Sequence, residues 1–157
     1  MHRAAFGRRD SDRPDEVVEA RLTDELRTDV GFLPHLSLVA VRDDAVVGHV
    51  LATRGWLEPL GTPALGLGPV GVRPDLQGRG VGTVLVHALL AVAEACAERV
   101  VALLGAPAYY RRFDFRPAAE LGIVAPDAAW GGHFQARHLT GPPATGTFRY
   151  AAPFGRL

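Results

Sequence analysis

The sequence predicts an α/β protein whose sheet has strands of mixed direction. Three observations predict this fold: two strand patterns joined by a short turn at residues 36–54, a strand–loop–helix pattern at residues 67–99, and a wholly apolar strand pattern at residues 100–104. The 157 residues suit one domain, 1–157, and their hydrophobic fraction of 48% is sufficient for a buried core.

The N-terminal part predicts a helix followed by a β-hairpin. In residues 16–30 the apolar side chains recur at the three- and four-residue spacing of an amphipathic helix. Residues 36–42 and 45–54 have the composition of strands, and the Asp-Asp pair between them forms the turn. Gly48 in the second strand indicates either a bulge or a close approach of another backbone.

The next segment predicts a strand that diverges from a neighbour, then a loop and the clearest helix of the chain. Residues 58–63 form a loop, and residues 65–72 form a glycine-rich strand. Because Pro69 has no N–H for a ladder, we expect it where the pairing is already interrupted. A loop at residues 74–80 leads into a helix that begins at Val81. The apolar face of this helix comprises Leu85, Ala88, Leu89, Val92 and Cys96.

The remaining residues predict a central strand, a short helix and weaker strands. Residues 100–104 are wholly apolar, as in a strand covered on both faces. Residues 106–112 form a short helix with its proline at an early position, and residues 113–117 turn into an edge strand. Residues 132–138 and 147–151 are further strand candidates.

Charge and composition exclude several classes of function. Seventeen basic residues balance seventeen acidic ones, so no overall field attracts nucleic acid. The six histidines show no metal-ligand spacing, and no metal is expected. No apolar leader begins the sequence, and the uncharged stretch at residues 80–93 is shorter than the roughly 20 residues that span a bilayer. We expect a cytoplasmic protein without a membrane partner, in which the lone Cys96 is a buried, inert thiol.

The loop at residues 77–83, QGRGVGT, predicts the chemistry. Its three glycines remove side chains where a ligand must approach the backbone closely. The helix that follows leaves its first N–H groups without partners and presents the positive end of its dipole. Together they form an anion site suited to a diphosphate, to which Arg79 and Arg73 add charge.

Three other interpretations of this loop fit less well. A Walker A loop needs a lysine after its last glycine, but Thr83 follows Gly82. A dinucleotide-binding fingerprint needs G-x-G-x-x-G and an acidic residue near the end of the next strand, whereas here the spacing is G-x-G-x-G and that strand ends Leu-Leu-Gly. A turn that only packs a helix on a sheet does not explain why a strand, glycines, an arginine and a helix start coincide.

Residues 70–83, VGVRPDLQGRGVGT, resemble the acetyl-CoA signature of the GCN5-related N-acetyltransferases (GNAT), in which V-x-P precedes Q/R-x-x-G-x-G/A. Here the two parts are VRP and QGRGVG. A second block, LGAPAYYRRFDFRP at residues 104–117, resembles the YhbS-like branch of that superfamily, as does ALGLGPV at residues 64–70. The resemblance extends from about residue 36 to residue 117.

The resemblance implies a fold and a cofactor site. The GNAT fold has a central mixed, largely antiparallel, twisted sheet with a splay between two strands and with flanking helices. The family binds acetyl-CoA as its co-substrate, with backbone groups of the splayed strand on the pantetheine arm and loop amides on the diphosphate. The implied positions are Val70, Gly71 and Val72 for the arm, and Gln77, Gly78, Arg79, Gly80, Val81, Gly82 and Thr83 for the diphosphate.

The resemblance also implies an N-acetyltransferase that works by direct attack of a primary amine on the thioester in a ternary complex. Tyr110 occupies the position of the family's tyrosine that protonates the departing CoA thiolate. The acceptor is an amine of a small molecule or of a protein. A lysine-like amine needs a base, for which Glu58 and His49 are candidates. The alternative is a catalytically inactive module that binds and senses acyl-CoA.

Two features depart from the family pattern. Asp114 stands where the family has a glycine before Phe115, and since aspartate enters the left-handed region at modest cost, we expect the turn to form. The family's first strand precedes a helix that begins like residues 3–6, and this sequence starts inside that helix. The start lies upstream, the strand is missing, or another chain supplies it; an unpaired edge favours a homodimer.

Overall fold

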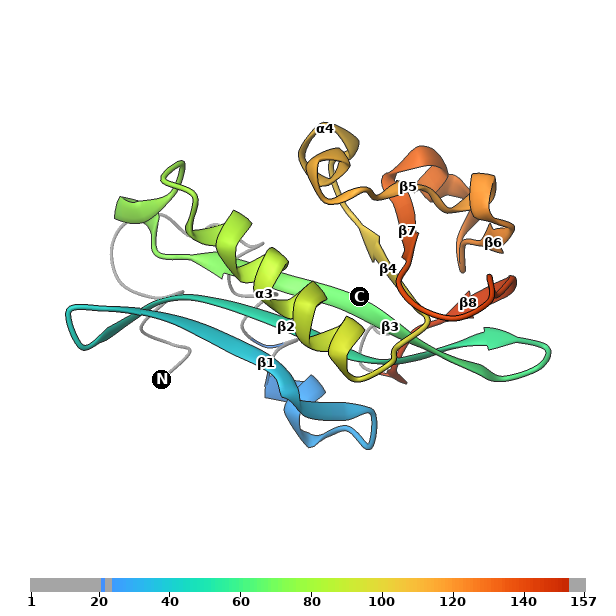
Figure 1. Cartoon of the computed structure of the whole chain (residues 1–157), viewed down its shortest axis with the longest axis horizontal. Helices are drawn as coiled ribbons and strands as arrows, with labels where there is room; N and C mark the ends of the chain where they lie inside the picture. Colours follow the sequence, from blue (N-terminus) through green and yellow to red (C-terminus); the bar gives the residue numbers. More distant parts are fainter. Residues whose placement is uncertain (1–20, 22–23, 153–157) are drawn as a thin grey trace.

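The structure is a computed structural model that describes residue 21 and residues 24–152. The described strands are β1 (Phe32–Arg42), β2 (Ala45–Glu58), β3 (Thr62–Val72), β4 (Val100–Leu104), β5 (Arg116–Pro117), β6 (Ile123–Val124), β7 (Phe134–His138) and β8 (Gly146–Arg149). The helices are α3 (Val81–Ala95) and α4 (Pro107–Tyr110), and residues 24–28 are also helical. Within these residues the strands form one mixed sheet in the order β5-β7-β4-β3-β2-β8-β6, with β1 also paired to β2. Figure 1 shows α3 lying across β1–β3 and α4 beside the end of β4.

The predicted β-hairpin is confirmed, with longer strands than expected. Asp43 and Asp44 have φ angles of 50° and 59°, the left-handed conformation of a tight turn whose twist matches that of the strands. β1 begins at Phe32 rather than at residue 36, and it includes Pro34. Proline is tolerated there because the pairing with β2 is irregular between Phe32 and Ser37.

Gly48 is both a bulge position and a point of close approach. The β1–β2 register shifts between Ala40, which pairs with Gly48, and the next residue of β1. A Cβ on Gly48 would lie 2.9 Å from Leu85 Cδ1, 3.0 Å from Val81 Cγ1 and 3.2 Å from the Gly71 carbonyl oxygen. The first turns of α3 therefore rest directly on the backbone of β2.

The sheet is covered on both faces. One buried cluster, which includes Val50, Leu67 and Val101, packs under α3. The other, which includes Phe134 and Phe148, lies on the opposite face beneath the C-terminal segment. That segment returns to the middle of the sheet, where β8 pairs with residues 56–58 of β2.

The buried face of α3 differs from the predicted one. Ala88 and Cys96 are exposed, whereas Val86, Leu90 and Ala93 are buried together with the predicted leucines. Aliphatic residues surround most of this helix, so their spacing alone did not fix the face. Cys96 is the C-cap residue beyond the last helical turn, which makes the expected buried thiol wrong.

The C-terminal end of α3 is held by a two-bond ion pair. Arg54 of β2 donates from both terminal nitrogens to the Glu98 carboxylate at 2.7 Å. Both side chains are largely buried, with 22% and 11% of their surfaces exposed. The predicted helix at residues 16–30 falls only partly within the described residues, and the expectations for residues 3–6 and for the family's first strand lie outside them.

Candidate cofactor site

The strands β3 and β4 part after two residue pairs. They run parallel and pair only where Leu65 meets Val101 and Gly66 meets Ala102. The rest of β3 continues to Val72 with β2 on one edge and without β4 on the other. The predicted splay is therefore present between these strands. We call the opening between β3 and β4 beyond their last pair the parting.

Pro69 lies where the sheet is interrupted, as predicted. The register between β2 and β3 shifts between Val50 and Ala52, opposite Gly68 and Pro69. Gly68 has a φ of 137°, a conformation that only glycine adopts without strain. This irregularity turns β3 away from β4 immediately after their last pair.

The divergent end of β3 presents main-chain groups to the parting. The Arg73 N–H donates to the Val47 carbonyl oxygen of β2 at 2.8 Å. Because successive strand residues point their polar groups to opposite edges, those of Val72 and Val70 face away from β2. The Gln77 side chain donates to the Val72 carbonyl oxygen at 3.1 Å, which agrees with this orientation.

The loop between β3 and α3 adopts a conformation that requires glycine. After a 3-10 turn, η1 (Pro74–Leu76), Gly78 and Gly80 have φ angles of 71° and 86°. A Cβ on either residue would meet no protein atom within 4 Å. These glycines are therefore required by the backbone geometry, and the surface above them is open.

The amides that lead into α3 differ in hydrogen bonding from those inside the helix. The first helical bond is donated by the Val84 N–H to the Gly80 carbonyl oxygen. Within residues 24–152 no acceptor is recorded for the amides of residues 78–83. The Gln77 amide makes a long bond of 3.4 Å to Pro74. Six consecutive N–H groups at the positive end of a helix form a site for an anion.

The two loop arginines differ in their partners. Arg73 donates two bonds to the Asp75 carboxylate, at 2.6 and 2.8 Å. The Arg73 hydrogen bond lowers the pKa of Asp75, which in turn raises the pKa of Arg73. Arg79 is exposed and forms no ion pair within the part of the chain that is described. Arg79 is thus the loop cation available to a ligand, whereas Arg73 is engaged by Asp75.

The short helix α4 places two adjacent tyrosines beside the parting. The Tyr110 ring packs on the end of β4, where a Cβ on Gly105 would lie 2.5 Å from Tyr110 Cε2. Tyr109 points toward α3 and places its hydroxyl beside Gly82. The turn after α4 forms as expected, with Asp114 in the left-handed region at a φ of 64°. The sequence motif singled out only Tyr110, because the family pattern has no role for its neighbour.

The two candidate bases lie in different parts of β2. Glu58 accepts a hydrogen bond from Arg149 Nε at 2.9 Å. It lies five residues beyond Thr53, the β2 partner of Gly66, so it is roughly 17 Å along the strand from the last pair of β3 with β4. His49 is buried on β2, with its Nε2 3.2 Å from Ser37 Oγ. The strand position of Glu58 removes it from the parting, whereas His49 pairs with Gly71 on the divergent part of β3.

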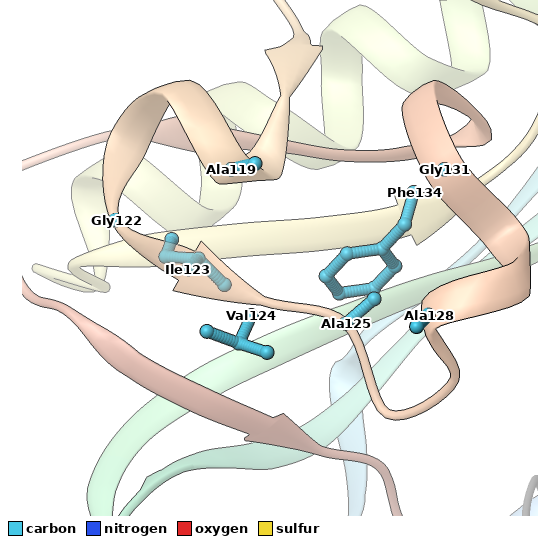
Figure 2. Close-up of a pocket in the computed structure, with 8 residues that line it drawn as sticks. All are labelled: Ala119, Gly122, Ile123, Val124, Ala125, Ala128, Gly131 and Phe134. Atoms are coloured by element: carbon cyan, nitrogen blue, oxygen red, sulfur yellow. The ribbon is translucent and has the colours of Figure 1, made fainter.

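A separate apolar hollow of about 320 Å³ lies in the C-terminal segment. Figure 2 shows the Phe134 ring between β6, which carries Ile123 and Val124, and the turn that carries Ala128. Its lining offers no ionisable side chain. Among the described residues no group of three metal-ligating side chains occurs, and none of the described helices is both long and apolar enough to cross a membrane.

Comparisons with known proteins match a family to the part of the chain that contains the loop at residues 77–83. Residues 4–115 match the model of the acetyltransferase (GNAT) family. The chain is 35% identical to the uncharacterised N-acetyltransferase YjhQ of Escherichia coli K12, over 69% of this chain and 61% of YjhQ. It is 31% identical to the uncharacterised N-acetyltransferase YhbS of the same strain, over 89% of this chain and 85% of YhbS.

Two solved structures are similar throughout most of the chain. The Escherichia coli YhbS structure in complex with CoA has a TM-score of 0.79 at 29% identity, and the match covers 88% of this chain and 78% of that one. A GNAT-family acetyltransferase of Brucella melitensis in complex with acetyl-CoA has a TM-score of 0.69 at 32% identity, with 87% and 77% covered. The curled mixed sheet with flanking helices is common to both.

Proposed function

The chain belongs to the GNAT family of acetyltransferases, and we propose from this that residues 1–157 form one catalytic domain that transfers an acetyl group from acetyl-CoA to a primary amine. The observation that carries the proposal is the parting of β3 from β4 beside the six amides of residues 78–83, which have no acceptor within residues 24–152. The two similar structures contain CoA and acetyl-CoA, which supports the same ligand here.

In this proposal the cofactor lies along the open edge of β3. Val70, Gly71 and Val72 form the wall for the pantetheine arm, with the polar groups of the two valines directed to it. The amides of residues 78–83 bind the diphosphate, and Arg79 adds a positive charge. Gln77 contributes by tying the loop to Val72. Each dipole interaction contributes roughly 0.3–1 kcal/mol at an exposed helix end, so several donors must act together.

The proposed reaction is direct attack of the amine nitrogen on the thioester carbonyl in a ternary complex. The C–S bond breaks as the C–N bond forms, the thiolate leaves with a proton from Tyr110, and the proton that the nitrogen loses passes to solvent, from which Tyr110 is reprotonated. The position of the Tyr110 ring at the end of β4, beside the parting, supports this role. A lysine-like amine must first lose a proton, which costs roughly 4.6 kcal/mol near pH 7.

Two measurements test the proposal. Calorimetry should detect binding of acetyl-CoA, and a panel of small amines and lysine peptides should reveal acceptors through the release of CoA thiol. Absence of heat with acetyl-CoA would remove the cofactor assignment and the proposal with it. Binding without CoA release for any amine would instead support the alternative of an acyl-CoA-sensing module.

A further inference from the structure

The hydroxyl of Tyr109 lies where three elements of the cofactor site meet. Tyr109 Oη is 3.2 Å from the point that a Cβ on Gly82 would occupy, and Val72 Cγ2 is 3.6 Å from the same point. Gly82 belongs to the first turn of α3, and Val72 is the last residue of the divergent strand β3. The hydroxyl therefore extends from α4 to the helix start that carries the unpartnered amides.

The ring that carries this hydroxyl is held in place from several sides. Arg112 Cζ lies 4.4 Å from the centroid of the Tyr109 ring, and Arg112 Nε donates to the Tyr109 carbonyl oxygen at 2.9 Å. Tyr110 and Phe113 contact the ring edge to face, with centroids 4.9 and 5.5 Å away. Residues of α4 and the turn after it thus fix where the hydroxyl can reach.

The hydroxyl itself has no hydrogen-bond partner among residues 24–152. Packing explains the ring, since a phenylalanine would make the same contacts with Arg112 and Phe113. It does not explain a hydroxyl directed at the N-terminal turn of α3. There the nearby main-chain groups are donors without acceptors, so an oxygen-rich ligand would satisfy the amides and the hydroxyl together.

We propose that Tyr109 is a cofactor-binding residue whose hydroxyl donates a hydrogen bond to a diphosphate oxygen of acetyl-CoA at the start of α3. This inference rests on the proposed function. It divides the tasks of two adjacent side chains: Tyr109 contributes to the affinity for the cofactor, whereas Tyr110 delivers a proton to the thiolate. Arg112 acts as a positioning residue for the Tyr109 ring.

The test measures Kd by calorimetry for the full chain and for Tyr109→Phe, with CoA and with 3′-phospho-ADP. The latter ligand carries the diphosphate but lacks the pantetheine arm. We expect Tyr109→Phe to weaken the binding of both ligands about 10- to 100-fold, the ordinary loss for one hydrogen bond to a charged group, and to leave kcat at saturating acetyl-CoA within twofold. Tyr110→Phe, the matched neighbour, should lower kcat and leave both Kd values unchanged.

Each other outcome overturns the inference. A Kd within twofold of the parent for both ligands would make Tyr109 a packing residue only. Weaker binding of CoA but not of 3′-phospho-ADP would show that the Tyr109 hydroxyl bonds to the pantetheine arm and not to the diphosphate. A lower kcat with unchanged Kd would make Tyr109 the proton donor. If the parent chain binds neither ligand, the proposed function itself fails; if it binds both and the variant binds equally, only this inference fails. Thermal unfolding confirms that the variants are folded.

Discussion

Replacement of Gly48 by alanine tests how closely α3 rests on the sheet. The added methyl would lie 2.9 Å from Leu85 Cδ1 and 3.0 Å from Val81 Cγ1, whereas carbon atoms in contact are normally about 3.5–4.0 Å apart. It would also lie 3.2 Å from the Gly71 carbonyl oxygen, which belongs to the paired backbone of β3 and has little room to move. Relieving these short contacts therefore requires α3 to shift away from β2.

The expected cost follows from two opposing terms. Overpacking of a filled core by one methyl costs about 1–3 kcal/mol. Alanine recovers roughly 0.5–1 kcal/mol over glycine in a strand, because less backbone entropy is lost on folding. The net expectation for Gly48→Ala is a loss of up to about 2.5 kcal/mol, with a central value of about 1.3 kcal/mol, which lowers the Tm by about 2–5 °C for a chain of this size.

Urea unfolding and calorimetric melting measure this loss, and Gly132→Ala is the matched control. Gly132 is exposed, its φ is not positive, and an added Cβ would meet no atom within 4 Å, so that substitution should be neutral or slightly stabilising. Combining Gly48→Ala with Leu85→Val, which removes the nearest methyl, should cost less than the sum of the single changes. Equal stability of the two glycine variants, or strict additivity with Leu85→Val, would refute the close contact.

Four further outcomes are expected. Tyr110→Phe should lower turnover about 100-fold without changing the Kd of acetyl-CoA, as steady-state kinetics and calorimetry would show; an unchanged rate would remove it from the mechanism. Arg54→Met should cost about 3 kcal/mol in urea unfolding because it leaves the Glu98 carboxylate buried, whereas Arg149→Met, in an exposed pair, should cost less than about 1 kcal/mol. Burial raises the pKa of Tyr150, so the folded state keeps a proton that the unfolded state loses above about pH 10. The free energy of unfolding should therefore be unaffected by this group below about pH 10 and lower by about 1.4 kcal/mol at pH 11, and thermal melts of Tyr150→Phe should not show this loss. Acetyl-CoA at 100 times its Kd should raise the Tm by roughly 5–11 °C, and NAD should leave it unchanged.

Sequence reasoning identified the elements whose signals are local. The Asp-Asp turn, the position of Pro69 and the glycine-rich loop depend on the conformational limits of single residues, so each was predicted where the structure has it. Membership of the family followed from the glycine-rich loop, and the splay followed from Pro69. The cofactor contacts assigned to residues 70–72, 77–83 and 110 stay predictions until a ligand complex or binding data test them.

The features that were predicted wrongly or not at all depend on long-range packing, which the local sequence does not determine. The face of α3 was misplaced because Val86 and Leu90 compete with Ala88 for burial, and only the position of the sheet decides between them. The short strand β6 contains two residues and has no periodicity to detect, whereas the edge strand predicted within residues 113–117 is present as β5. The orientation of Tyr109 depends on where α4 stands relative to the start of α3, a long-range relation that no local pattern records.

The return of β8 to β2 makes the sheet depend on a strand that is synthesised after β1 to β7. One edge of β2 is shared: β1 pairs along residues 45–53, and β8 takes residues 56–58. Until residues 146–149 have left the ribosome, residues 56–58 of that edge lack their β8 partner, and Gly55 lacks the Phe148 ring that covers it in the finished fold. A nascent chain, or one truncated before residue 146, would thus expose an unprotected strand edge to other chains until β8 pairs with it.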